Sequence, residues 1–270
     1  MAQADQYVLG YRRAEQERLQ QQAVQLAAES ERLFDQIGIG PGARIVEIGC
    51  GPRGCLDLLA NRAGLTGQVI GIERSEDAVA LARTFVEEQG LSNVEVLQGD
   101  ARATGLERAS FDVVTSRLVL VNIPRPDEVV AEAAALTRPG GWVAFHEADW
   151  VSHVCDPALG AWTSLIDLFV AYSKKNGIDP FIGRTVPGLL RQAGIVDLQV
   201  HPIIHAYPAG HPRHNILLDF TENVGERLIA ENLVSKVALQ ELKTELKRHL
   251  DDPGTLVISH LFLQVWGRKP

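Results

Sequence analysis

Cysteine is scarce in this chain, as are other features that would place it in a special class of protein. Three cysteines occur, Cys50, Cys55 and Cys155, and none are paired at metal-ligand spacing, so neither a disulfide framework nor a cysteine zinc site is expected. No stretch approaches the roughly 18–20 apolar residues of a membrane helix, and residues 1–6 lack the apolar core of a signal peptide. We therefore expect a cytoplasmic protein that does not bind a membrane.

Basic residues are outnumbered and dispersed. The chain has 26 Lys and Arg against 34 Asp and Glu, a formal net charge of −8, and no basic cluster stands out. A nucleic acid is therefore not an expected partner. Hydrophobic residues make up 46% of the 270 positions, which indicates a substantial core in one domain with insertions.

The first part of the chain has a helical pattern. Apolar residues recur every three or four positions from Leu19 to Ile37, which predicts one long amphipathic helix from about Arg12 to Ile37, ended by "GIGPG" at 38–42. Its ordinary role would be packing.

From Ala43 onward, short apolar runs alternate with helical patterns, which is typical of an α/β fold with a parallel sheet covered on both faces. In such sheets, ligands bind beyond the carboxyl ends of the strands. The segments outside this pattern, about 1–37, 150–182 and 208–252, are candidates for a cover over the site. The expected strands are 44–48, 68–73, 94–98, 111–116, 141–147, 196–207 and 255–267, and the expected helices are about 53–63, 75–89, 126–138, 185–194 and 215–250.

The turn "EIGCGPRG" at 47–54 follows the first expected strand. Gly49, Gly51 and Gly54 fit the dinucleotide pattern G-x-G-x-x-G, in which the backbone approaches a ligand closely. Glu47, however, would repel a diphosphate at this turn and would favour an amino group or a sulfonium. The alternative for Glu47 is a solvent-exposed or arginine-paired side chain.

Two more acidic residues end the next two strands. A carboxylate at Glu73 suits hydrogen bonds from both hydroxyls of a ribose, and Asp100 in "QGDA" would accept from the amine of an adenine. Each alone has a surface-charge interpretation. The ordered series Glu47, Glu73 and Asp100 is more specific and indicates an adenosine-like ligand with a cationic tail.

These motifs resemble the class I S-adenosylmethionine-dependent methyltransferases, in their small-molecule, UbiE-like branch. The resemblance runs from about Arg44 to Glu147, through "VEIGCG", "GIERS", "LQGDA", "FDVVTSRLVLVNIP" and "LTRPGGWVAF", and the opening "YVLGYRRAEQERL" also fits. It implies a Rossmann-like, seven-stranded, mostly parallel sheet whose last strand is antiparallel, with helices on both faces. It also implies that residues 1–42 cover the cofactor site, and that residues 43–270 form the methyltransferase domain with helical insertions at about 150–182 and 208–252.

The resemblance further implies S-adenosylmethionine as cofactor, with S-adenosylhomocysteine as product. Glu47 would lie near the cofactor's amino group, Glu73 would bind its ribose, and an N-terminal tyrosine would close over its methionine end. The implied cofactor-binding residues are Tyr7, Tyr11, Glu47, Gly49, Cys50, Gly51, Glu73, Arg74, Asp100, Ala101, Ser116 and Arg117. One departure is Arg53, where the family commonly has glycine. Either the turn is reshaped around Pro52 and Gly54, or Arg53 contacts an anion.

Methyl transfer requires a positioned nucleophile and benefits from a general base. The base candidates are His146 and Glu147, expected just past the fifth strand, followed by Asp149, His153, His205 and His214. The four histidines of 201–214 fit no compact ligand spacing, so no metal is expected. If the aromatic residues of 150–181 face the cleft, the acceptor would be a small hydrophobic or aromatic molecule methylated on O, C or N.

Other functions remain open. The main alternative is a protein of this fold that binds the cofactor without methylating, either as a scaffold or as a non-methylating enzyme. A nicotinamide-dependent dehydrogenase shares the glycines and Glu73, but Glu47 is unfavourable there. A homodimer is possible through the amphipathic helices near both ends of the chain.

Overall fold

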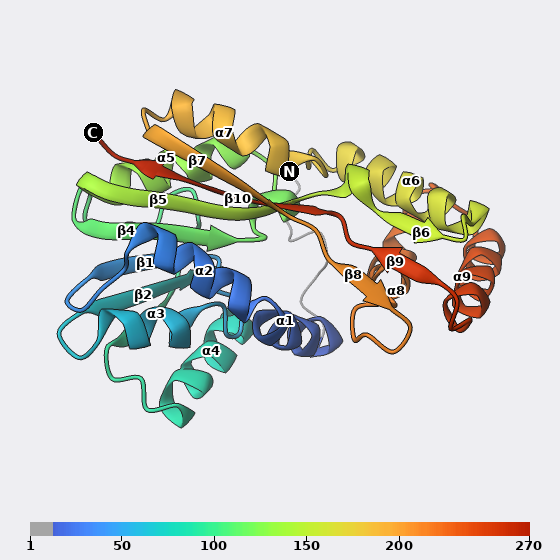
Figure 1. The fold of residues 1–270 in the computed structure, drawn as a ribbon, viewed down its shortest axis with the longest axis horizontal. Helices are drawn as coiled ribbons and strands as arrows, with labels where there is room; N and C mark the ends of the chain where they lie inside the picture. The colour runs from blue at the N-terminus through green and yellow to red at the C-terminus, as the bar shows by residue number, and fades with distance from the viewer. Residues whose placement is uncertain (1–12) are drawn as a thin grey trace.

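A seven-stranded sheet organises the protein in the computed structural model, which describes residues 13–270. The strand order is β3-β2-β1-β4-β5-β10-β7 (Figure 1). β10 is antiparallel to both neighbours, while the pairs among β1 to β5 are parallel, so the fold class expected from the sequence is confirmed. The strands are β1 (Arg44–Ile48), β2 (Gln68–Glu73), β3 (Val94–Gln98), β4 (Phe111–Arg117), β5 (Thr137–Asp149), β7 (Val196–Ile203) and β10 (Leu261–Arg268).

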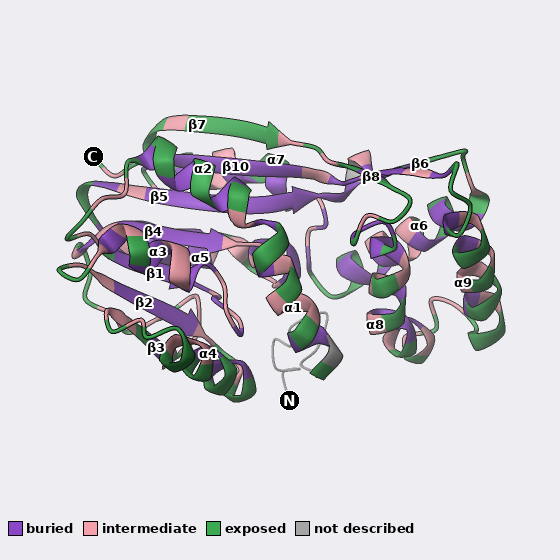
Figure 2. Ribbon diagram, turned by 60° about the horizontal axis from the view of Figure 1, so that its bottom comes forward, coloured by how far each residue is buried: buried purple, intermediate pink, exposed green. Residues whose placement is uncertain are grey.

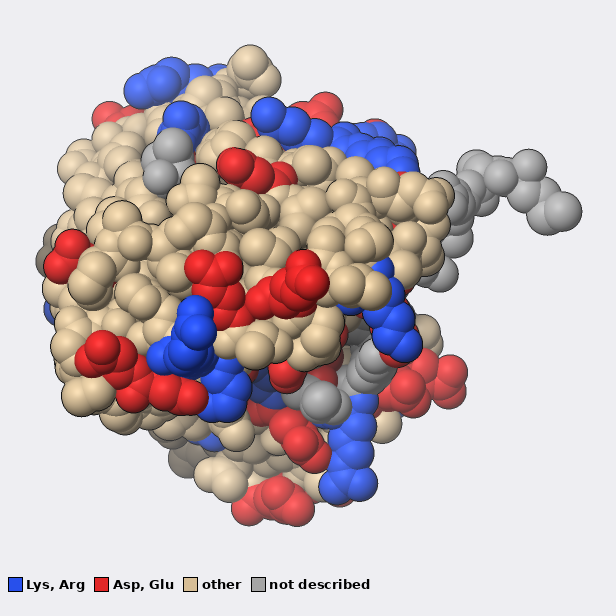
Figure 3. Space-filling model, turned by 90° about the vertical axis from the view of Figure 1, so that its right-hand side faces the viewer, with Lys and Arg blue, Asp and Glu red and all other residues tan. Residues whose placement is uncertain are grey.

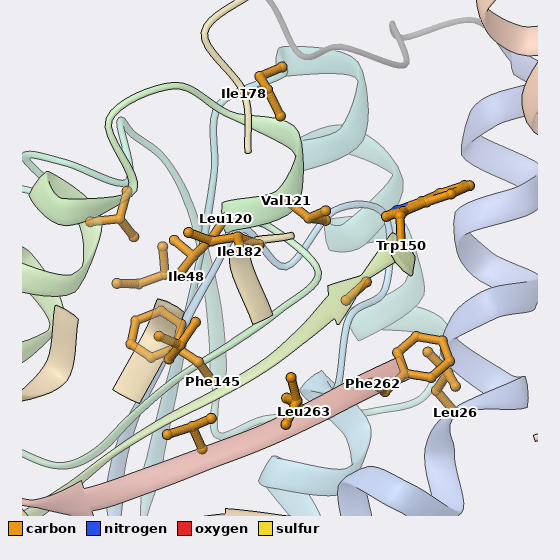
Figure 4. Close-up of a cluster of buried hydrophobic side chains, with 14 of the residues drawn as sticks. Leu26, Ile48, Leu120, Val121, Phe145, Trp150, Ile178, Ile182, Phe262 and Leu263 are labelled. Carbon is orange, nitrogen blue, oxygen red and sulfur yellow. The ribbon is translucent and has the colours of Figure 1, made fainter. Parts of the chain in front are cut away.

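Helices cover both faces of the sheet because its central strands are apolar on both sides. The burial colours of Figure 2 show β1, β2, β4 and β5 as mostly buried. One core lies under α2 (Ala27–Ile37), α3 (Leu56–Ala63) and α4 (Glu76–Glu88). A larger core lies on the other face, with α5 (Pro126–Leu136) and α7 (Ile182–Gln192). In this second core, Ile48, Phe145 and Leu263 from three strands lie near Ile182 of α7 (Figure 4).

Two long helices predicted from periodicity are each divided in the structure. The expected helix 12–37 is α1 (Arg13–Gln25) and α2, separated at the buried Leu26. The expected helix 215–250 is α8 (Ile216–Ala230) and α9 (Lys236–Leu250). Between them Asn232 has a positive φ of 58°, and the Ser235 side chain accepts a hydrogen bond from the Ala238 N–H to start the new helix. Periodicity continues across such breaks, so it does not reveal them.

The two strands expected at 196–207 and 255–267 are also each interrupted. They continue as β8 (Ala206–Pro208) and β9 (Leu256–Ile258), and β5 continues into β6 (Val154–Asp156). The order β6-β9-β8 of the resulting small sheet repeats the order β5-β10-β7 of the main sheet. We call the interruption, formed by residues 150–153, 204–205 and 259–260, the strand break.

The segments beyond the strand break form a helical lobe. α6 (Gly160–Lys175), α8 and α9 pack against one another beside the small sheet (Figure 1). α1 joins this lobe to the main sheet, because Asn223 of α8 donates a 2.9 Å hydrogen bond to Glu15 and Arg18 lies 5.3 Å from the ring of Phe220. The lobe therefore stands over the carboxyl ends of the central strands. No helix within residues 13–270 is long and apolar enough to cross a membrane.

Candidate active site

A cleft opens at the carboxyl ends of β1, β2 and β4, between the sheet and the helical lobe. It holds about 1440 Å³ of empty space, including its open mouth. Its walls come from α1, from the loops after β1 to β5, and from the lobe. The lining includes Gln16, Arg18, Leu19, Gln22 and Ala23 of α1, Glu47 to Pro52 except Ile48, Gly54, Glu73, Arg74, Asp100 to Arg102, Arg117 to Val119, Val121, Trp150, Phe169, Arg213, Phe220 and His260.

The glycine turn is shaped by close contacts. A β-carbon on Gly49 would lie 2.3 Å from Val119 Cγ2, and one on Gly54 would lie 2.5 Å from Glu47 Oε2. Gly54 has a positive φ of 54°, whereas Arg53 is not among the residues with positive φ. The turn is therefore reshaped at Gly54, which is one of the two alternatives that the sequence left open.

Arg53 also has an anionic partner, as the other alternative required. Its Nη2 lies 2.9 Å from Asp57 Oδ2, and its guanidinium lies 4.7 Å from the centre of the Phe85 ring. This partner belongs to α3 of the chain itself. Arg53 therefore braces the turn from the outside and leaves the cleft to the backbone of Gly49 to Gly51.

Glu47 is buried at the N-terminus of α3, with an exposed fraction of 1%. Both carboxylate oxygens accept from the Cys55 N–H at 2.9 Å. Burial raises the pKa of Glu47 to about 7, against the opposing effects of Arg117 and of the Cys55 hydrogen bonds. A cationic group placed beside this carboxylate would favour its ionised form.

Arg117 fixes the other side of the same turn. Its guanidinium donates to Ser30 Oγ at 2.9 Å and to the Gly54 carbonyl at 3.1 Å. These two bonds tie α2 and the glycine turn to the end of β4. The position of Glu47 therefore depends on contacts from three separate elements.

Glu73 is held by three backbone N–H groups. Gly51 donates to Oε2 at 3.0 Å, while Arg74 and Ser75 donate to Oε1 at 2.8 Å. Burial raises the pKa of Glu73, and the backbone hydrogen bonds partly offset this effect. The carboxylate is thus oriented before any ligand binds, at the end of the strand beside the glycine turn.

Asp100 forms an ion pair within its own loop. Arg102 donates to both carboxylate oxygens, with distances of 2.9 and 2.8 Å, and holds the pKa of Asp100 down at about 2. A carboxylate has about four acceptor positions, so Asp100 keeps capacity for another donor. Arg74, Ala101 and Arg102 line the cleft beside it.

A sequence family also matches the part of the chain that carries these groups. The family model "Methyltransferase domain" matches residues 39–175, just over half of the chain. The chain belongs to the methyltransferase-domain family. This confirms the resemblance to class I methyltransferases drawn from the motifs, and with it, at the level of the family, the cofactor S-adenosylmethionine.

Individual methyltransferases agree with this assignment. The chain is 32% identical to a demethylmenaquinone methyltransferase of Lactococcus lactis over 60% of each sequence. A phosphoethanolamine N-methyltransferase of Haemonchus contortus, solved with S-adenosylhomocysteine, has a TM-score of 0.58 and 21% identity, over 90% of this chain and 52% of that one. The cyclase SpnF has a TM-score of 0.55 and 19% identity, over 90% and 81%. The chain spans only about half the length of several curated relatives it matches.

Most of the residues predicted to bind the cofactor lie together. Glu47, Gly49, Cys50, Gly51, Glu73, Arg74, Asp100, Ala101 and Arg117 all line the cleft. Ser116 does not: it lies within β4, 1% exposed, with its Oγ unpartnered inside the described chain. Successive strand residues point to opposite faces, so Ser116 and Arg117 cannot both face the cleft. Tyr7 and Tyr11 lie outside the described residues.

The two preferred base candidates are not on the cleft. β5 continues to Asp149, so His146 and Glu147 lie inside the strand rather than past its end. Glu147 accepts hydrogen bonds from the N–H groups of residues 119–121 at 2.9–3.2 Å, which orders the turn after β4. His146 is buried against Phe262, and burial lowers its pKa to about 3. The position expected for them past the strand was wrong, because β5 continues two residues beyond Glu147.

The secondary base candidates mostly have structural partners. Asp149 pairs with Arg184. His214 bridges the carbonyls of Tyr207 and Leu250 at 2.7 and 3.1 Å. Among residues 13–270, no group of three or more His, Cys, Asp or Glu is arranged to hold a metal.

His260 and Arg213 line the cleft but were not expected to. His260 stacks on Trp150 with ring centres 5.2 Å apart, and its Nδ1 lies 3.3 Å from His153 Nε2. The sequence gives no local signal for them, because residues 150, 213 and 260 meet only through the strand break. Of the aromatic residues expected over the site, Trp150 and Phe169 face the cleft, and Phe220 joins them.

Proposed function

We propose that this protein transfers a methyl group from S-adenosylmethionine to an oxygen, carbon or nitrogen of a small hydrophobic or aromatic molecule in the cytoplasm. The observation that carries the proposal is the placement of Glu47, Glu73 and Asp100 around one glycine-lined cleft. Family membership supports the reaction class, and the acceptor follows from the walls of the cleft.

The residues present fit the cofactor. The Glu47 carboxylate, buried without a lysine or arginine within ion-pair distance in the described chain, suits the cofactor's ammonium group. Glu73 is oriented for two ribose hydroxyls, and Asp100 with Ala101 suits the adenine. At positions 49 and 54, glycine leaves the space that Val119 and the Glu47 carboxylate occupy. A diphosphate would meet the buried carboxylate of Glu47 and the half-buried one of Glu73 here, which disfavours a dinucleotide.

The bound cofactor supplies a methyl group on a sulfonium, whose sulfur keeps the electron pair of the broken C–S bond as the acceptor atom bonds to carbon. The chain's part is to align the acceptor and exclude water. Residues of α1 line the cleft, which supports the proposal that residues 1–42 cover the site, with the lobe segments 150–182 and 208–252 opposite. Trp150, Phe169 and Phe220 offer the acceptor an apolar wall.

The test has two steps. Calorimetry with S-adenosylhomocysteine and NAD should show binding of the first and none of the second. Single-turnover reactions with a methyl-labelled cofactor, over a panel of aromatic and quinol acceptors, should then transfer label. Binding of NAD in place of S-adenosylhomocysteine would refute the proposal.

A second candidate function is cofactor binding without methylation. Its specific support is that neither His146 nor Glu147 reaches the cleft, so no carboxylate or histidine chosen as a base faces an acceptor. The matching fold of a cyclase shows that this architecture is found outside methyltransferases. Tight binding of the cofactor with no transfer to any acceptor of the panel would favour this candidate.

A further inference from the structure

Arg213 is a buried arginine on the wall of the cleft. It lies between β8 and α8, with an exposed fraction of only 7%. Its guanidinium lies over two aromatic rings, 5.7 Å from the centre of the Tyr207 ring and 5.6 Å from that of Phe262. These contacts hold the planar group in place but provide no hydrogen-bond acceptor.

Within residues 13–270, no carboxylate lies at ion-pair distance from Arg213, and its Nη1 is buried with no hydrogen-bond partner. Glu29 is the acidic residue that acts on Arg213 through space, but its carboxylate is next to His205, 3.4 Å away. A buried charge normally costs several kcal/mol unless it is paired. Because Arg213 is buried without such a pair, its guanidinium indicates a binding partner that is not part of the described chain.

Charges of both signs act on Arg213 through space, with Tyr207 and Glu29 opposing two like charges. Arg18 and Arg117 both act on it as like charges, and burial lowers its pKa. The nearby His153 and His260 have pKa values well below the ordinary range because of burial, so both rings are neutral. An anionic group in this part of the cleft would therefore meet a guanidinium and no competing carboxylate.

The wall next to Arg213 is aromatic. Trp150 packs against Phe169 at 4.1 Å and against Phe220 at 4.9 Å between ring centres, and His260 stacks on its indole. These four side chains and Arg213 all line the same cleft. A flat apolar ring fits such a wall, with its polar substituent directed at the arginine.

We propose that the methyl acceptor is a small aromatic molecule carrying an anionic oxygen, a carboxylate or an ionised hydroxyl, that pairs with Arg213. This rests on the proposed function and narrows its substrate class. A neutral acceptor would leave the guanidinium unpaired in a closed site.

The experiment uses the full chain saturated with S-adenosylhomocysteine and two probes of equal shape, 1-naphthoate and 1-naphthamide. We expect calorimetry to show at least about tenfold tighter binding of the carboxylate, as a charge-assisted bidentate pair provides. In Arg213→Met the preference should fall below about twofold. Arg191→Met, at an exposed arginine of α7, is the matched control and should keep the full preference.

Two further arms make the result decisive. Arg213→Lys keeps the charge without the planar fork and should give an intermediate preference, which covers the case of a methionine variant that fails to fold. Replacing the probes by 4-nitrophenol above its pKa and by nitrobenzene separates an ionised hydroxyl from a carboxylate as the preferred anion.

The outcomes separate this inference from the proposed function. Absence of S-adenosylhomocysteine binding to the unaltered protein refutes the proposed function, and the inference with it. Normal cofactor binding with equal affinity for the two members of each probe pair, the naphthyl pair and the nitrophenyl pair, refutes the inference alone. If Arg213→Met weakens S-adenosylhomocysteine about tenfold and leaves the probe preference unchanged, Arg213 binds the cofactor's carboxylate, and the inference is wrong.

Discussion

Gly54 is the residue on which the geometry of Glu47 depends. Its φ of 54° and the 2.5 Å approach of Glu47 Oε2 to the position of a β-carbon leave room for glycine alone. The Gly54 carbonyl also accepts from Arg117. The glycine therefore sets the place of the carboxylate and of the guanidinium that faces it.

Replacing Gly54 by alanine should destabilise the protein and weaken cofactor binding. The left-handed conformation alone costs about 1–2 kcal/mol, and the displaced Glu47 carboxylate adds to that cost. Urea unfolding and calorimetry with S-adenosylhomocysteine measure the two effects. Gly188→Ala is the control: Gly188 lies in α7 with no atom within 4 Å of a β-carbon, so this change should stabilise by about 0.5–1 kcal/mol. Equal effects of Gly54→Ala and Gly188→Ala would contradict the role assigned to Gly54.

Glu47 should make cofactor binding depend on pH. Its pKa of about 7 in the free protein means that a proton must leave before the carboxylate pairs with an ammonium group. Affinity for S-adenosylhomocysteine should therefore rise by up to about tenfold per pH unit below pH 7, and level off above it. Calorimetry across this range, in buffers of different ionisation enthalpy, also counts the released proton. The Glu47→Gln variant should bind more weakly with no such slope; a slope that persists would assign it to another group.

At the residue scale, the motif predicted the acidic series because each member lies within two residues of the end of a strand. Glu47, Glu73 and Asp100 keep this position whatever the lobe does. His146 was misplaced because it was expected past the end of the fifth strand, whereas β5 continues to Asp149 and encloses it. A short error along a strand moves a side chain from the site to the core, since the side chains alternate between faces.

Among the elements, α1 is the one that joins the two halves of the cleft. Glu15 is 1% exposed, pairs with Arg18 on its own helix, and accepts a hydrogen bond from Asn223 of α8. α1 thereby holds the cofactor side of the cleft against the lobe. In α2, the next helix along the chain, Ser30 accepts a hydrogen bond from Arg117.

Removal of the Asn223 amide should loosen this cover. In Asn223→Ala, the loss of one hydrogen bond to a charged group should speed the release of S-adenosylhomocysteine by about 3–10-fold, with a smaller effect on association. Stopped-flow fluorescence measures both rates. Gln21→Ala, an exposed amide on α1, should leave them unchanged. Unchanged release in the Asn223 variant would show that α1 does not hold the cover closed.

The strand break is the element that local sequence did not reveal. Residues 150–153, 204–205 and 259–260 each interrupt a strand. The last two segments are joined by hydrogen bonds from Ser259 N to the His205 carbonyl and from His205 N to Ser259 Oγ. The apolar patterns of 196–207 and 255–267 run on through the interruptions. The break appears only when three strands are aligned in register.

For the whole molecule, buried ionisable groups should set the pH range of stability. The pKa values of His146 and His153 are lowered to about 3, so their neutral forms stabilise the fold above pH 6.5, and this contribution is lost as pH falls through 3. The pKa values of Glu47 and Glu147 are raised to about 7 and 8, so their contribution is complete below pH 4.5 and is lost as pH rises through those values.

The free protein should therefore be most stable between about pH 4.5 and 6.5, with thermal unfolding temperatures lower on both sides. S-adenosylhomocysteine should raise the unfolding temperature more at pH 8 than at pH 5.5, because the ligand favours ionised Glu47. Differential scanning calorimetry with and without the ligand tests both statements. A stability that climbs steadily to pH 9 in the free protein would contradict the assigned burial of the two glutamates.

The surface of the molecule carries both signs of charge. On the face drawn in Figure 3, acidic and basic side chains are interspersed. The positive charge that matters for the proposed acceptor, on Arg213, is buried on the wall of the cleft.

The sequence by itself determined where the strands of the first half lie along the chain, the glycine turn and the acidic residues near the strand ends, because each depends on neighbours within a few positions. Only the tertiary structure decided which histidine and which arginine reach the cleft. Trp150, Arg213 and His260 come from distant segments that meet where three strands break. Contacts of this kind depend on register between strands, which no local pattern records.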